Sequence, residues 1–170
     1  MSVLSTTVRA THLLTNAAWF GGSLMGAVGL NPATREPDTA RERREAADTG
    51  WNRWGPVQGA AIGLHLLSGL GIVADNRRRV FAHPPTTAAV VLKTATTGAA
   101  IASSLAAWKV GETIGDTGAS ADDRAQARRH ISWLQWATPV TTGALLVLDA
   151  YLGEQQRGVA GLLDRPMGRR

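Results

Sequence analysis

Four long runs without a formal charge dominate the pattern of this chain, and blocks of charged residues separate them. The runs cover residues 10–34, 54–74, 84–108 and 131–148, and Lys93 is the only charge inside them. A helix rises about 1.5 Å per residue, so runs of 18 to 25 residues match the roughly 30 Å hydrocarbon core of a bilayer. The pattern therefore predicts an all-α fold, a four-helix transmembrane bundle.

Residue types at the ends of the runs set the expected spans at about 10–31, 54–74, 84–108 and 131–151. Asn31-Pro32 should end the first span, because proline disfavours helix in the residue before it. Pro84 and Pro85 fit the first turn of the third helix, where a missing N–H costs little. Pro139 lies inside the fourth run and should kink that helix.

The connections carry their own helix signals. Thr39 and Glu42 have capping-box spacing, which predicts a short interfacial helix in the first connection, lying on the membrane face. Ser120 and Asp123 predict a cap outside the membrane, with the fourth helix entering it at Ile131. We expect residues 1–153 to form a single four-span domain and residues 154–170 to be a loose, polar, basic tail.

The first run has an alternative interpretation as a cleaved signal peptide, with Ala27-Val28-Gly29 as the small-residue cleavage site. The run is longer than a usual signal core, and Asn16 and Trp19 interrupt it. These features favour a retained first span.

Four spans place the N- and C-termini on the same side of the membrane. Lys plus Arg residues number 8 on that side and 9 on the other, so the count does not orient the protein. Arg77, Arg78 and Arg79 lie tight against the second span, where positive charge weighs most. We therefore expect a multi-pass protein of the cell (inner) membrane with cytoplasmic termini.

Five of the six tryptophans fall near helix ends on the side opposite the termini: Trp51, Trp54, Trp108, Trp133 and Trp136. Indole prefers the membrane–water interface, where its ring is apolar and its N–H stays hydrated. The alternative is a soluble four-helix bundle with these rings in its core. Four uncharged runs of such length favour the membrane.

The amino-acid composition limits the kinds of molecule that this chain is expected to bind. The mean hydropathy of −0.06 hides the segregation of charges into blocks. The net charge of +5 does not indicate nucleic-acid binding, because arginines flank apolar runs instead of forming one basic stripe. The absence of cysteine excludes disulfides and thiolate metal sites. The expected partners are the lipid bilayer and a homo-oligomer or larger membrane complex, with Gly22-x-x-x-Gly26 and Gly59-x-x-x-Gly63 as helix contact faces.

Each span carries a stripe of polar residues at helical spacing, and four stripes predict one shared polar interior. Interhelical hydrogen bonding explains such stripes, and so does a ligand pocket. The candidate ligand-binding residues are His12, Asn16, Gln58, His65, Lys93, Thr97 and Asp149.

Counting from the span ends places His65 and Lys93 at one depth, roughly 13 Å inside. Two cations there would repel, so His65 should be neutral if Lys93 is charged. His12 and Asp149 lie close to the boundary and are expected to pair, with Asp149 too shallow to reach Lys93. No second histidine is expected at the depth of His65.

The pattern therefore predicts no metal site and no cofactor, with haem or a quinone as the groups to test for. No pair of carboxylates lies at catalytic spacing in the spans, and no residue is assigned a catalytic role.

Two phrases carry a resemblance to known proteins: WFGGSLMGAVGLNPA at 19–33 and WGPVQGAAIGLHL at 54–66. The chain resembles small four-helix integral membrane proteins of actinobacterial type. It is more loosely similar to anthrone-oxygenase-like membrane domains, which share the four-span plan and a Gly-rich first helix ending near Pro-Ala. The resemblance covers the spans only and implies no functional residue.

Two functional hypotheses follow. The first is a non-catalytic accessory or self-associating membrane component, which a packed interior and an exposed glycine seam would favour. The second is a membrane enzyme or carrier for a lipid-soluble ligand, quinone-like or with an anionic head group. A cavity lined by His65 and Lys93 would favour this second hypothesis.

Overall fold

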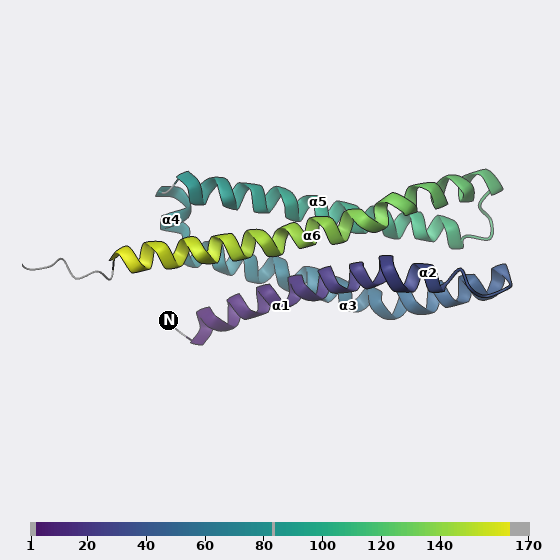
Figure 1. The fold of residues 1–170 in the computed structure, drawn as a ribbon, viewed down its shortest axis with the longest axis horizontal. Coiled ribbons are helices and arrows are strands. Elements are labelled where there is room, and N and C mark those ends of the chain that lie inside the picture. The colour runs from purple at the N-terminus through teal and green to yellow at the C-terminus, as the bar shows by residue number, and fades with distance from the viewer. Residues whose placement is uncertain (1–2, 83, 164–170) are drawn as a thin grey trace, which may run out of the picture.

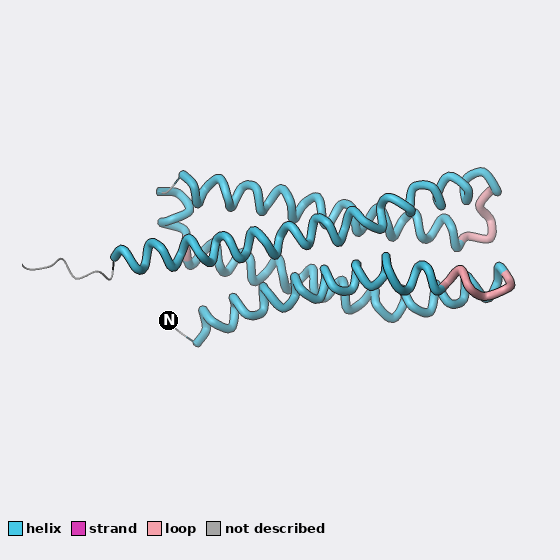
Figure 2. The backbone as a smooth tube through the Cα atoms, viewed as in Figure 1, coloured by secondary structure: helices cyan, strands magenta, loops and turns pink. Residues whose placement is uncertain are grey.

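The computed structural model describes residues 3–82 and 84–163, and within these ranges every regular element is helical. Figure 2 shows short loops joining the helices at their ends. The elements in chain order are α1 (Val3–Met25), the π-helical segment η1 (Gly26–Leu30), α2 (Asn31–Ala33), α3 (Ala40–Asp75), α4 (Arg77–Ala82), α5 (Pro84–Gly115) and α6 (Ala121–Leu163). The predicted all-helical fold is confirmed.

The long helices α1, α3, α5 and α6 lie lengthwise beside one another and give the molecule an elongated shape (Figure 1). α1 packs against α3 and against α6, and α5 packs against α6. Only a slight contact joins α3 to α5. The fold therefore consists of two helix pairs, α1 with α3 and α5 with α6, and α1 connects the pairs through α6.

Three helical segments are long and apolar enough to cross a membrane by length and composition: Val3–Ala33, Ala40–Asp75 and Pro84–Gly115. Their outer faces expose large apolar side chains such as Leu14, Leu67, Leu70 and Val91. α6, which contains the predicted fourth span, is not among the three. Gln135, Pro139 and several threonines lower the mean hydropathy of that span.

The first connection differs from the prediction. The capping box is present, since the Glu42 N–H donates to Thr39 Oγ1 at 3.2 Å and the Thr39 N–H donates to Glu42 Oε2 at 3.2 Å. The helix that it starts does not end before the predicted second span but continues through it as α3, which has 36 residues. Gly50 is tolerated inside the helix, so nothing separates a short interfacial helix from the second span. α3 is about 54 Å long and exceeds the hydrocarbon core.

The first span ends two residues later than predicted, at Ala33. Asn31 keeps helical angles, φ −62° and ψ −40°, and its N–H bonds to Gly26 O across the wide turn of η1. Pro32, which has no N–H to donate, follows Asn31 shortly after this π-helical segment. Pro32 then stands in the first turn of α2.

The last helix also extends beyond the prediction. Asp123 N–H donates to Ser120 Oγ at 3.1 Å, so the predicted cap is in place. α6 then continues to Leu163, and residues 154–163 are helical where a loose tail was expected. The rest of that tail, 164–170, lies outside the described residues.

Candidate functional site

Much of the interior is polar, as the four stripes predicted. Every long helix contributes buried polar side chains to it, and among the described residues these are His12, Asn16, Ser23, His65, Ser68, Ser104, Thr138 and Thr142. Burial of hydroxyl, amide and imidazole groups is costly unless each finds a hydrogen-bond partner. The arrangement of these partners therefore decides what the interior can do.

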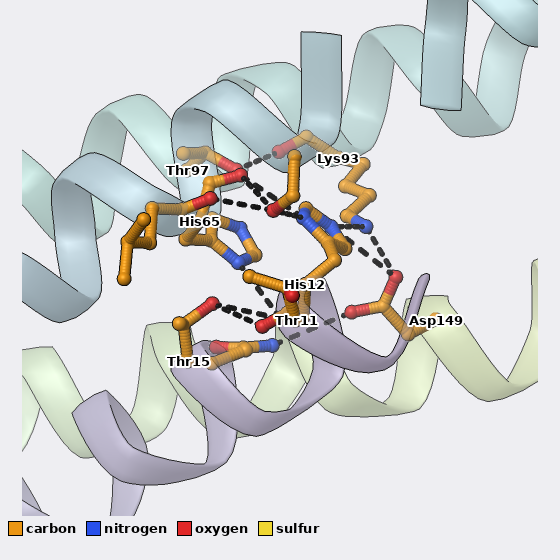
Figure 3. A network of polar contacts seen from close by, with 10 residues as sticks. Thr11, His12, Thr15, His65, Lys93, Thr97 and Asp149 are labelled. Atoms are coloured by element: carbon orange, nitrogen blue, oxygen red, sulfur yellow. Dashed lines mark hydrogen bonds and ion pairs between the residues drawn. The ribbon is translucent and has the colours of Figure 1, made fainter. Parts of the chain in front are cut away.

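His12 of α1 and His65 of α3 are stacked on each other at the contact between the two helices (Figure 3). Their ring centroids are 3.9 Å apart and the ring planes differ by 16°. The Nδ1 of His12 lies 3.0 Å from His65 O, and the Nδ1 of His65 lies 3.3 Å from His12 O. Gly69 leaves room for this pair, because a Cβ there would lie 3.1 Å from His12 Cε1.

Lys93 of α5 and Asp149 of α6 complete the cluster from the other helix pair (Figure 3). Lys93 Nζ forms an ion pair with Asp149 Oδ1 and lies 2.6 Å from His12 Nε2. The Lys93 side chain is 16% exposed and that of Asp149 is 9% exposed. One cation therefore faces one anion in a nearly buried setting.

The hydrogen-bond geometry assigns the tautomer of His12. An ammonium group only donates, so His12 Nε2 accepts from Lys93 Nζ. The ring proton of a neutral His12 is then on Nδ1, where it donates to His65 O, with Ser68 Oγ at 3.1 Å. The cluster thus links a residue from each long helix through one continuous set of contacts.

Two predicted depths were wrong. His12 lies level with His65, and Asp149 reaches Lys93 directly. Both errors came from counting depth from the ends of the charge-free runs. α1 begins at Val3 and α6 continues to Leu163, so both residues lie far inside their helices. His12 Nε2 lies 3.8 Å from Asp149 Oδ1, so the two residues are neighbours, and Lys93 Nζ contacts both of them.

Asn16 occupies the next turn of α1 after His12. Its Nδ2 is 3.4 Å from Asp149 Oδ2, which is a long hydrogen bond. Its Oδ1 is the one buried side-chain oxygen or nitrogen without a hydrogen-bond partner in the part of the chain that the structure describes. A buried acceptor left unsatisfied costs about 1–3 kcal/mol.

The remaining candidates take part less directly. Thr97 Oγ1 donates to Lys93 O at 2.9 Å within α5, so it contacts the backbone of Lys93 and not its ammonium group. Gln58 lies about two turns along α3 from His65, where its Oε1 accepts from Trp54 Nε1 at 2.9 Å. The structure therefore brings together His12, Asn16, His65, Lys93 and Asp149, which we call the polar cluster.

An apolar layer lies next to the polar cluster. Trp19, Ala100 and Leu145 are fully buried and pack together, and the Trp19 ring meets His65 edge-on with centroids 6.2 Å apart. Trp19 Nε1 donates to Ser104 Oγ at 3.1 Å. The sequence held a signal for this role, because Trp19 is the one tryptophan away from a predicted helix end.

The donor set does not suit a metal or a bis-histidine haem. No group of three or more His, Asp or Glu residues that could hold a metal ion occurs among residues 3–82 and 84–163. The two buried histidines are stacked ring on ring, which leaves no space between them for a haem iron. The cluster can instead hold a charge pair, orient a neutral imidazole and exchange protons among hydrogen-bonded groups.

Comparison with known proteins adds no assignment to this geometry. No protein-family model, curated protein or solved structure matches the chain.

Proposed function

We propose that this chain is a small integral membrane protein, a four-helix transmembrane bundle that acts as a non-catalytic accessory or self-associating component. The three span-like helices support membrane insertion. α6 packs against both α1 and α5, so it would cross the membrane with them. Its polar Thr138 and Thr142 are buried, and its apolar Val147 is exposed.

We propose that the protein lies in the cell (inner) membrane and that both of its termini are in the cytoplasm. The support for this topology is that α1 begins and α6 ends at the same end of the molecule in Figure 1. The arginine-rich start of α4 lies in the connection between α3 and α5, which a four-span topology places on that same side.

One observation supports the non-catalytic role: the charged groups of the polar cluster form contacts with one another. Lys93 is paired with Asp149 and contacts His12. A buried ion pair is weak as a source of stability but specifies which elements are neighbours. Here it ties α5 and α6 to α1, and the histidine stack ties α1 to α3.

The outer face of α3 supports self-association. Gly55, Gly59 and Gly63 are spaced four residues apart, and a Cβ at any of them would contact nothing within 4 Å. Small residues at this spacing let helix backbones approach closely in lipid. The Gly59-x-x-x-Gly63 pair, expected to be a helix contact face, is open to the outside, where a second molecule can pack.

The experiment is size-exclusion chromatography with light scattering on the protein in mild detergent. Gly59→Leu should convert the oligomer to a monomer. Gly98→Leu is the matched control, because Gly98 on α5 is equally open and has no glycine four residues before or after it. Monomeric wild-type protein that also copurifies with no partner would contradict the proposal.

A second candidate function is a membrane enzyme or carrier that binds a lipid-soluble ligand, quinone-like or with an anionic head group. The unsatisfied Asn16 Oδ1 beside Asp149 and the partial exposure of Lys93 favour it. Mass spectrometry and an absorbance spectrum of material that copurifies in mild detergent test this candidate. A ligand present in wild-type protein and lost in Asn16→Ala would support it over the first.

A further inference from the structure

A groove open to the outside of the molecule lies between the C-terminal part of α1 with η1 and the N-terminal half of α3. Its volume is about 420 Å³. Small and apolar residues line it, among them Gly21, Gly22, Met25, Leu30, Trp51 and Trp54. None of these residues takes part in the polar cluster.

Glycines create this groove. A Cβ at Gly22 would overlap the Trp54 ring, and a Cβ at Gly26 would overlap the Trp51 ring, so both indoles lie directly on the backbone of α1. Gly21 borders the open part, since a Cβ there would meet nothing within 4 Å. The predicted Gly22-x-x-x-Gly26 contact face is thus used, but by two indole rings.

The two tryptophans that line the groove have no free indole N–H, because both N–H groups form hydrogen bonds within the protein. Trp51 Nε1 donates to Asn31 Oδ1 at 3.2 Å, and Trp54 Nε1 donates to Gln58 Oε1 at 2.9 Å. With both N–H groups satisfied inside the protein, the rings present only carbon to the groove. The occupant that fits is an apolar chain.

The position of the groove identifies the kind of molecule. Both of its walls belong to helices apolar enough to span a membrane, and Trp54 starts the charge-free stretch of α3. Arg53 next to it is exposed and has no ion-pair partner among the described residues. Tryptophan and arginine at one level mark the interface, where phospholipid phosphates lie.

We infer that the groove binds one phospholipid, with an acyl chain between α1 and α3 and its phosphate at Arg53. The inference rests on the membrane location proposed above but not on self-association. Bulk lipid is as apolar as the groove, so selective binding comes from packing on the indole faces and from the arginine–phosphate contact.

The test is native mass spectrometry of purified protein after exchange into detergent micelles with dioleoyl-phosphatidylglycerol. Gly21→Leu fills the groove without a clash and should lower the fraction of protein carrying one lipid by about threefold or more, while Gly98→Leu should leave it unchanged. Gly21→Ala should give an intermediate loss, and Arg53→Gln a partial one. Circular dichroism confirms that each variant remains folded.

A phosphatidylglycerol with a photoreactive acyl chain locates the site. We expect crosslinks at Ala18 and Gly22, which line the groove on the apolar side of Arg53. Gly21→Leu should remove these crosslinks and Gly98→Leu should keep them. Equal lipid retention by Gly21→Leu and Gly98→Leu, crosslinks confined to α5 and α6, or a second protein copy at this face would overturn the inference. Oligomers give separate mass peaks, so failure of self-association is distinguishable from failure of lipid binding.

Discussion

Replacing Lys93 by methionine should destabilise the protein, because the change leaves the Asp149 carboxylate nearly buried without its cation. Removal of one partner from a buried ion pair costs about 3–5 kcal/mol. The Lys93 side chain retains 16% exposure, so we expect the lower end of this range. His12 Nε2 also loses its donor, and Asn16 Nδ2 at 3.4 Å is too distant to compensate Asp149 fully.

The double variant Lys93→Met/Asp149→Leu should recover most of this loss, because neither charge is then left alone. Replacing a buried pair by apolar residues is often neutral or stabilising by about 1–4 kcal/mol. Glu45→Gln is the control, since the Arg41–Glu45 pair is exposed within one helix and its loss costs only about 0.3–0.5 kcal/mol.

Reversible unfolding in mixed micelles, followed by circular dichroism, measures all four proteins. A Lys93→Met variant as stable as the wild type would refute the reasoning, because the ion pair would then carry no energetic consequence. A double variant no more stable than Lys93→Met would refute it equally, since the loss would not arise from the unpaired carboxylate.

Other substitutions test the packing. Trp19→Phe removes the buried donor to Ser104 and should cost about 1–3 kcal/mol in micelle unfolding, whereas Trp133→Phe, at a residue 82% exposed, should stay within about 0.5 kcal/mol. Gly22→Ala overpacks the Trp54 ring and should cost about 1–3 kcal/mol, a cost that Gly21→Ala should lack; equal stabilities would contradict the indole packing. Thr39→Ala removes the cap of α3 and should lower stability by about 1 kcal/mol, and an unchanged melting temperature would argue against the cap.

The all-helical fold and the polar interior could be predicted from the sequence, because both follow from the local pattern of apolar, polar and charged residues. Charge-free runs and stripes at helical spacing are visible without tertiary information, and the caps at Thr39 and Ser120 were correctly located. The pattern also selected every residue of the polar cluster, since His12, Asn16, His65, Lys93 and Asp149 were all candidates. Whether these residues bind a ligand stays a prediction.

Depth was predicted poorly because charges do not end helices. A helix can continue through charged residues, as α3 does from Ala40 past Arg53 to Asp75. Asp149 was therefore placed near the surface, and its contact with Lys93 was missed. The stacking of His12 on His65 depends on how α1 and α3 are rotated about their axes, which only their mutual packing fixes.

The central claim is that α1, α3, α5 and α6 each cross the membrane, and cysteine accessibility tests it most directly. The chain has no native cysteine, so single variants label without background. In intact cells, a membrane-impermeant maleimide should label Asp38→Cys and Thr117→Cys, and should label Arg78→Cys and Gly153→Cys only after permeabilisation. If Gly153→Cys labels as Thr117→Cys does, α6 does not cross, and if all four variants fractionate away from membranes, the bundle is not a membrane protein.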